Sequence, residues 1–196
     1  MNGPNALHPR GHAAAPTQRL TVPVSLAPDE AALALAPRLR SLAGVGVPDA
    51  RAPLAVPVVT IDGYSGSGKS TLAAALARLL PIWQVLHLDD WYPGWDGLAQ
   101  GAEVARRIAA DLREGRASSY VTWDWETQGP GHTVDVPLAP TIIEGCGAWD
   151  ADADLSVWVA DPGEEERRNR ALARDGQTYA PHWRRWADQD LGRSLP

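Results

Sequence analysis

The fold is decided by the stretch "VPVVTIDGYSGSGKSTLAAALARLL" (residues 56–80), where a strand pattern gives way to a helix pattern across a glycine-rich turn. Its first six residues are apolar or β-branched, which is typical of a strand buried on both faces of a parallel sheet. Residues 71–80 favour a helix, which Pro81 ends. The turn between them, "GYSGSGKST" (63–71), contains Lys69, the only lysine in a chain of 196 residues.

The turn has the spacing Gly-x-x-x-x-Gly-Lys-Ser, which is the Walker A pattern of phosphate-binding loops. Glycine lets successive backbone N–H groups turn inward, so that they and the helix N-terminus face a polyphosphate. Lys69 is expected to reach the terminal phosphates and Ser70 to bind Mg²⁺. The sequence therefore predicts ATP and magnesium as ligands. The predicted phosphate-binding residues are Gly63, Ser65, Gly66, Ser67, Gly68, Lys69, Ser70 and Thr71.

Composition excludes several classes of protein. Guanine-specific GTPases read their base with an Asn-Lys-x-Asp segment, which requires a second lysine that this chain lacks. A net charge of −6 argues against a nucleic-acid-binding surface. The sequence contains no apolar run of about 18 residues, so no membrane span is expected. The single cysteine, Cys146, permits no internal disulfide and favours a cytoplasmic location.

The first 55 residues differ from the remainder. Residues 1–28 are rich in proline, glycine and alanine without periodicity, and are expected to be mobile. Residues 29–44 predict a helix that Pro37 kinks or divides, and residues 45–55 resemble a linker. We therefore expect a mobile extension over 1–55 and a kinase-like domain over 56–196.

From residue 56 onward, strand and helix patterns alternate, which predicts an α/β fold with a parallel sheet between helices. A β-hairpin is expected at 120–136, around a Gln-Gly-Pro-Gly turn, and a C-terminal lid helix at 162–176. The expected architecture is the three-layer P-loop NTPase fold. Further strands are predicted at 85–88, 141–145 and 155–160, and a further helix at 98–114.

The pair Asp89-Asp90 ends the second predicted strand and allows three interpretations. It is a Walker B pair of a motor ATPase, or two acids that cap a turn, or the acceptor site of a kinase. In a kinase, a carboxylate at this strand end takes the proton of the acceptor hydroxyl. Because the pair lies much closer to Lys69 than in motor ATPases, we favour the kinase interpretation.

Four segments, "IDGYSGSGKST", "LDDWY", "IIEG" and "RNRALARD", follow in the order found in the uridine kinase and phosphoribulokinase-like P-loop kinases. The chain resembles this family over about residues 56–190. The resemblance implies that Asp89 is the catalytic base, that Tyr92 contacts the acceptor, and that Arg170 and Arg174 belong to the lid. The hairpin lies where uridine kinases place a substrate-binding hairpin, which makes Asp124 a candidate acceptor contact.

The resemblance also matches Arg167 to an arginine of the lid helix. Arg170 and Arg174 lie four residues apart on one helix face, where phosphoryl transfer needs positive charge. Their alternative is ordinary ion pairing with the acids at 164–166, which we prefer for Arg168. Glu144 follows an apolar strand, so its carboxylate is expected at the ligand-binding edge of the sheet. It holds Mg²⁺, directly or through water, or it is a buried strand-end acid.

The residues around Asp89 limit the chemical class of the acceptor. Residues 89–100 contain three aspartates and neither arginine nor lysine, which favours an uncharged small molecule with a hydroxyl group. Trp95 is expected to bind this acceptor. It belongs to a group of tryptophans that form an aromatic wall or pack beneath the hairpin: Trp91, Trp95, Trp123 and Trp125. His87 is interpreted as a core residue, and no zinc site is expected.

The sequence thus predicts an ATP-dependent phosphotransferase that acts on a small uncharged hydroxyl compound. The alternatives are a shortened paralogue that binds ATP without turnover, and a small ATPase that uses Asp90 or Glu144 to activate water. The chain stops at 196, soon after the predicted lid, where family members continue into a strand that helps to form the adenine pocket. Three explanations are open. The nucleotide base is held loosely, or a second chain completes the adenine pocket, as in a homo-oligomer. Otherwise this protein is a shortened member of the family.

Overall fold

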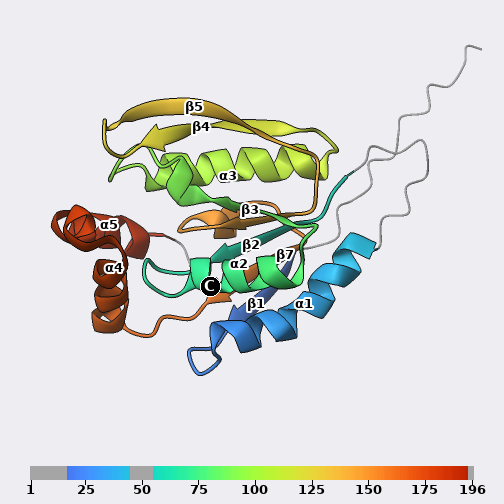
Figure 1. The fold of residues 1–196 in the computed structure, drawn as a ribbon, viewed down its shortest axis with the longest axis horizontal. Helices are drawn as coiled ribbons and strands as arrows, with labels where there is room; N and C mark the ends of the chain where they lie inside the picture. Colours follow the sequence, from blue (N-terminus) through green and yellow to red (C-terminus); the bar gives the residue numbers. More distant parts are fainter. Residues whose placement is uncertain (1–16, 45–54, 194–196) are drawn as a thin grey trace, which may run out of the picture.

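The computed structural model describes residues 17–44 and 55–193, which are built around a parallel sheet of five strands (Figure 1). The strand order is β1-β7-β2-β6-β3. The predicted α/β class with a parallel sheet between helical layers is confirmed. The strands are β1 (Gln18–Val22), β2 (Val58–Asp62), β3 (Gln84–His87), β6 (Thr141–Glu144) and β7 (Leu155–Val159).

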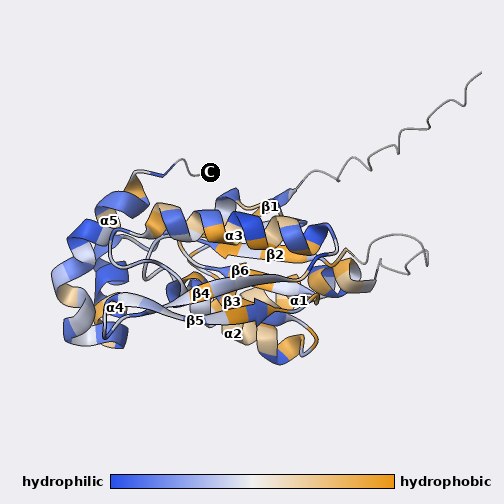
Figure 2. Ribbon diagram, turned by 90° about the horizontal axis from the view of Figure 1, so that it is seen from above, coloured by the Kyte–Doolittle hydropathy of each residue, from blue (hydrophilic) through white to orange (hydrophobic). Residues whose placement is uncertain are grey.

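Helices cover both faces of this sheet. Helices α1 (Pro28–Gly44) and α2 (Lys69–Leu79) pack against each other on one face, and α3 (Leu98–Arg113) covers the opposite face (Figure 1). All five residues of β2 are buried. Figure 2 shows hydrophobic residues along this central strand and mostly hydrophilic ones on α4 and on strands β4 and β5. Two hydrophobic clusters, one on each side of the sheet, form the core.

The predicted hairpin is present as β4 (Ser118–Asp124) and β5 (Gly129–Val136), which pack beside α3 (Figure 1). The C-terminal residues form α4 (Glu164–Tyr179) and α5 (Trp183–Leu191), of which α5 has no counterpart in the sequence prediction. Short 3-10 turns occur at η1 (Leu88–Asp90), η2 (Ala148–Asp150) and η3 (Ala180–His182). No helix within the described ranges combines the length and apolar character needed to cross a bilayer.

Strand β1 corrects the expected division at residue 55. It pairs in parallel with β7 over its whole length, from Gln18 opposite Leu155 to Val22 opposite Val159. The apolar face of α1 is buried in the same core as β2 and α2. An edge strand needs a hydrophobic signal on one face only, and in "QRLTV" that signal is two residues long. The mobility expected for residues 1–16 and the linker expected at 45–54 lie outside the described residues.

Helix α1 continues through Pro37, so the expectation that Pro37 divides it is wrong, while the alternative of a kink stays a prediction. Proline removes the hydrogen bond to the carbonyl group four residues earlier, which is that of Leu33. Both Pro37 and Leu33 lie on the exposed face of α1. Water can therefore hydrate the freed carbonyl group, and the buried face of the helix keeps its packing.

Candidate active site

The loop between β2 and α2 has the geometry of a phosphate cradle. Gly66 and Gly68 have φ angles of 80° and 108°, a left-handed conformation that favours glycine. A Cβ atom on Gly66 would lie 2.2 Å from the carbonyl oxygen of Arg167. The buried hydroxyl of Ser67 has no hydrogen-bond partner within the described residues. A phosphate oxygen could accept a hydrogen bond from this hydroxyl, so the loop fits a polyphosphate.

Lys69 begins α2 and is buried, with 7% of its surface exposed. Its Nζ lies 3.1 Å from the carbonyl oxygen of Tyr64 and 3.4 Å from the sulfur of Cys146. Burial alone would lower the pKa of Lys69, but the charges of the nearby carboxylates of Asp190, Glu144 and Asp62 raise this pKa. The ammonium group is therefore charged and ready to bind an anion.

Helices α4 and α5 clamp the loop at Ser65. The Ser65 N–H donates to Asp190 at 2.8 Å, and the Tyr179 hydroxyl donates to Ser65 Oγ at 2.9 Å. Arg167, which is only 3% exposed, donates to the Ser65 carbonyl oxygen and to Asp161. Ser65 was predicted to bind phosphate, and the structure instead places its N–H and hydroxyl in the anchor of the C-terminal helices. Arg167 is likewise a buried anchor rather than a mobile lid residue.

A buried ion cluster completes this anchor. Arg193 donates to both oxygens of Asp62, at 2.7 and 3.1 Å, and to Asp190 at 2.6 Å. Asp62 and Asp190 are 0% and 1% exposed. Asp62 also accepts hydrogen bonds from the backbone N–H groups of Gly63, Gly147 and Trp149. The cluster therefore joins the end of β2, the phosphate loop and the end of α5.

Arg193→Met is expected to lower the free energy of unfolding by about 3 kcal/mol, because it leaves two buried carboxylates without their cation. Urea unfolding, followed by circular dichroism, measures this loss. Arg184→Met on α5, the helix that precedes Arg193, is the matched control, since Arg184 is exposed and makes no ion pair within the described residues. It should change the free energy by less than about 0.5 kcal/mol. An equal effect of the two substitutions would contradict the role of the cluster.

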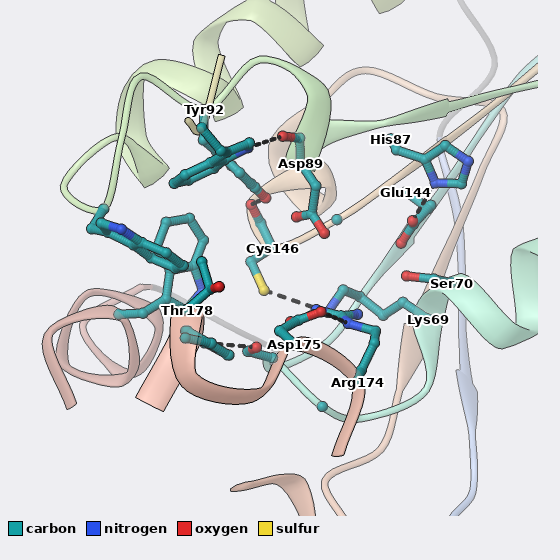
Figure 3. A pocket seen from close by; sticks show the side chains of 17 residues that line it. Lys69, Ser70, His87, Asp89, Tyr92, Glu144, Cys146, Arg174, Asp175 and Thr178 are labelled. Carbon is teal, nitrogen blue, oxygen red and sulfur yellow. Dashed lines mark hydrogen bonds and ion pairs between the residues drawn. The ribbon is translucent and has the colours of Figure 1, made fainter. Parts of the chain in front are cut away.

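Beside the loop lies a cavity of about 560 Å³, which we call the acceptor cavity (Figure 3). Asp89, on η1, projects its carboxylate into it, and no group of the described residues donates a hydrogen bond to that carboxylate. Trp125 holds the backbone in place by donating its Nε1–H to the Asp89 carbonyl oxygen at 3.0 Å. Asp89 is exposed to solvent within this concave wall. Desolvation there, reinforced by the charge of Glu144, raises the pKa of Asp89, although Lys69 and Arg174 oppose the shift.

Glu144 and His87 face each other on neighbouring strands at the carboxyl edge of the sheet. Glu144 Oε1 lies 2.6 Å from His87 Nδ1, and this hydrogen bond raises the pKa of His87 against the opposing effect of burial. His87 was predicted to be a core residue, but it is half-buried and lines the acceptor cavity. It escaped the sequence interpretation because its pairing with Glu144 depends on the register between β3 and β6.

Ser70 and Glu144 both line this cavity, with their oxygens turned toward each other (Figure 3). The described residues contain no group of three or more histidine, cysteine or acidic side chains that could hold a metal ion by themselves. Mg²⁺ commonly takes one or two protein oxygens and completes its shell with water and phosphate oxygens. A hydroxyl and a carboxylate at the end of a phosphate loop fit that requirement.

The two predicted lid arginines lie in different places. Arg174 lines the acceptor cavity and forms a bidentate pair with Asp175, at 2.8 and 2.7 Å. This pair, together with the charges of Asp89 and Glu144, raises the pKa of Arg174 above its ordinary value despite burial. Arg170 instead pairs with Glu166 on the exposed face of α4 and lies outside the acceptor cavity. Only Arg174 is thus positioned beside Asp89.

The aromatic wall is present, but its members differ in role. Tyr92 is 1% exposed and donates its hydroxyl to the Cys146 carbonyl oxygen at 2.7 Å, so this hydroxyl is already committed within the protein. Trp95 lines the acceptor cavity and stacks on Tyr179 and His182. Trp125, which was expected either in this wall or packed beneath the hairpin, lines the cavity as well.

Asp124 requires a correction, because it does not line the acceptor cavity. Its Oδ1 accepts hydrogen bonds from the backbone N–H groups of Thr127 and Glu126, and these bonds lower the pKa of Asp124. Asp124 therefore caps the hairpin turn. Trp125, the first residue of the turn that follows β4, lines the cavity instead.

Cys146 is a further residue that the sequence did not single out. Burial raises the pKa of its thiol to about 12, so the thiol is neutral at physiological pH. Its sulfur lies 3.5 Å from both the Gly63 carbonyl oxygen and Asp190 Oδ2. It packs against the inner side of the phosphate loop and limits the space around Lys69.

Comparisons with known proteins agree with this architecture. No protein-family profile matches the chain, and no curated protein gives a significant match. A solved structure from Bacillus stearothermophilus, described as a "possible uridine kinase", is 21% identical, with 76% of this chain and 94% of that chain covered and a TM-score of 0.44. A Silicibacter structure, described as a "putative fructose transport system kinase", is 22% identical, with 83% and 96% covered and a TM-score of 0.50. The second likeness shows a shared fold. The chain therefore has the fold of the P-loop kinases that its motifs resemble.

Proposed function

We propose that the protein is a phosphotransferase that moves the γ-phosphate of ATP to a hydroxyl group of a small uncharged acceptor. The observation that carries this proposal is the free carboxylate of Asp89, which faces the phosphate loop across the acceptor cavity. A volume of about 560 Å³ is within the usual range for small-molecule sites. A general base at one side and a phosphate cradle at the other are the two elements that hydroxyl phosphorylation requires.

In this mechanism the loop N–H groups and Lys69 bind the phosphates, and Ser70 and Glu144 would hold a magnesium ion. The bound ion would neutralise phosphate charge. Asp89 orients the acceptor hydroxyl and accepts its proton while the hydroxyl oxygen bonds to the γ-phosphorus. The bond from that phosphorus to the β,γ-bridging oxygen breaks, and ADP leaves. Arg174 turns from Asp175 toward the transferred group and stabilises its charge.

The charges that line the acceptor cavity support an uncharged acceptor. Its cationic side chains, those of Lys69, Arg174 and His87, all lie toward the phosphate loop and the end of β6. The opposite wall is aromatic, with Trp95, Trp125 and further rings. If the acceptor already carried a phosphate group, that wall would offer no cation to bind it. A sugar or nucleoside-like ring can instead pack against the apolar surface of the wall.

ADP release over a panel of nucleosides, sugars and vitamins tests the proposal. Acceptor-dependent ADP release, with a phosphorylated product detected by mass spectrometry, is the expected result. ATP binding without release for any acceptor would instead favour the non-catalytic alternative, and release without an acceptor would favour the ATPase. One observation favours the non-catalytic alternative: both candidate lid arginines are paired with acids of their own helix.

Arg174→Met is expected to lower kcat by about 100-fold, because the transferred phosphate loses a cation. It should also move the acidic limb of the pH–rate profile to higher pH. The charge of Arg174 lowers the pKa of Asp89, so its removal raises that pKa, and Asp89 loses its proton only at higher pH. Steady-state kinetics as a function of pH measure both effects.

Arg168→Met is the matched control, since Arg168 is exposed on the same helix and lines neither the acceptor cavity nor the region around Lys69. It should leave kcat and the acidic limb unchanged within about twofold, as is usual for an exposed side chain. If kcat falls in Arg174→Met but the acidic limb does not move, the charge of Arg174 does not influence the pKa of Asp89. That result would contradict the assigned geometry.

A further inference from the structure

A second cavity, of about 730 Å³, lies on the other side of the phosphate loop. Half of its wall is the loop itself and the start of α2, with Arg170 and Arg174 of α4. The other half comes from the N-terminal part of the chain: the connection between β1 and α1, residues 23–27, together with Val22 and Pro28. We call this connection the β1–α1 loop. It brings a segment that lay outside the predicted kinase domain to the phosphate-binding site.

The two cavities meet at Gly66, Lys69, Ser70 and Arg174, which line both. In an in-line transfer, the attacking hydroxyl and the leaving nucleotide lie on opposite sides of the phosphorus. Because the acceptor approaches from the side of Asp89, the nucleotide must leave the phosphate loop on the side of the second cavity. We propose that the β1–α1 loop holds the base of the nucleoside triphosphate there. This inference rests on the proposed function.

The second cavity has the polarity that a nucleoside triphosphate requires. Its phosphate end carries the cations Lys69, Arg170 and Arg174. Its other end is apolar, with the side chains of Pro23, Val24, Leu26, Pro28, Val159 and Pro162. No aspartate or glutamate is among the described residues that line it. A charged chain of phosphates fits the first end, and the flat, weakly polar face of a base fits the second.

The β1–α1 loop is held in shape before any ligand binds. Val22 is paired with β7, and its carbonyl oxygen accepts from the Ala160 N–H at 3.0 Å. A turn follows, in which the Leu26 N–H donates to the Pro23 carbonyl oxygen at 3.1 Å. A loop that is already ordered costs little entropy when it closes on a ligand.

Between these fixed points, Val24 exposes 57% of its surface and lines the second cavity. Within the described residues, the backbone of Val24 and the hydroxyl of Ser25 have no hydrogen-bond partner. The apolar side chain can therefore contact the face of a base. The free polar groups beside it can bind the edge of that base.

Isothermal titration calorimetry with Mg²⁺ present, comparing ATP with inorganic triphosphate, tests this assignment. The wild type should bind ATP at least about tenfold more tightly, because only ATP has a base to bury. Val24→Trp fills the apolar end and should weaken ATP binding by about tenfold or more, with triphosphate binding unchanged within about twofold. Leu33→Trp is the matched control, since Leu33 is exposed on α1 and lines neither cavity; it should change neither affinity.

Photolabelling with 8-azido-ATP gives a second measurement that requires no variant. The label is expected in the tryptic peptide of residues 20–38, which contains the β1–α1 loop, and excess ATP should suppress it. Unchanged ATP affinity in Val24→Trp, a label confined to other peptides, or wild-type ATP binding no tighter than triphosphate binding would overturn the inference and leave the phosphate site standing. Binding of neither ligand would defeat the proposed function as well. Base-dependent ATP binding without acceptor turnover would defeat only the kinase proposal.

Discussion

Asp89→Asn is expected to lower kcat/KM for the cognate acceptor by about 10²–10⁴-fold, which is the usual contribution of a general base. The amide has nearly the size of the carboxylate but cannot accept the proton of the hydroxyl. In free energy the loss corresponds to about 3–5 kcal/mol of transition-state stabilisation. Binding of ATP should change much less, because Asp89 belongs to the acceptor side of the site. Coupled-enzyme kinetics and calorimetry with ATP measure the two effects separately.

The pH profile sharpens this prediction. Desolvation at the cavity wall and the charge of Glu144 raise the pKa of Asp89, so wild-type kcat/KM should fall as the pH is lowered through a pKa above the ordinary value of aspartate. Asp89→Asn should lose this acidic limb. Asp90→Asn is the matched control, because Asp90 is adjacent but does not line the acceptor cavity. Full phosphotransfer in Asp89→Asn, or an equal loss in Asp90→Asn, would contradict Asp89 as the base.

The parts of the fold that the sequence predicted well depend on local interactions. The phosphate loop is an example: glycine at 66 and 68 meets a local conformational need, and the flanking strand and helix have clear periodicities. The strand that ends before Asp89 was also predicted, from the apolar pair Val85 and Leu86, although β3 is an edge strand and only Leu86 of it is buried. Local signals therefore sufficed for the sheet's centre and for the phosphate end of the site.

Parts that depend on contacts between distant residues were not predictable in this way. Strand β1 has one apolar face, and only its pairing with β7 makes it part of the sheet. The bond between His87 and Glu144 requires the register of two strands that are 57 residues apart. The contact of Asp190 with the Ser65 N–H spans 125 residues, and no pattern near either residue indicates it.

For Ser65 and Asp124, the sequence likewise did not show which groups each side chain contacts in the folded protein. Both were assigned a ligand from their position in a motif, and both use their polar atoms inside the protein instead. A motif indicates which residues lie near a ligand, but the hydrogen bonds available to each side chain decide which of them reach it. This distinction explains why Lys69, which lies in the same motif, is different. Its ammonium group is held only by a carbonyl oxygen and a neutral sulfur, which a phosphate can displace.

Lys69→Met and Lys69→Arg are both expected to lower kcat/KM by about 10³-fold or more, since removal of one preorganised charge at a transferring group has effects of this size. The loss in Lys69→Arg is the more informative one, because the positive charge is kept. The side chain is buried between the Tyr64 carbonyl oxygen and the Cys146 sulfur, where a broad, planar guanidinium group does not fit. Histidine aside, every other basic side chain of the sequence is an arginine, so a site that needed only charge could have used one.

Calorimetry with inorganic triphosphate should show weaker binding in both Lys69 variants, and urea unfolding should show that both remain folded. Because the nearby carboxylates outweigh the desolvation cost and raise the pKa of Lys69, its charge stabilises the fold, and Lys69→Met should be less stable than the wild type when no nucleotide is present. Arginine should be less stable there, because its extra atoms overfill the space beside Cys146. If Lys69→Arg instead kept kcat/KM within about threefold of the wild type, the shape of the cation would not matter, and the assigned contacts around Nζ would be contradicted.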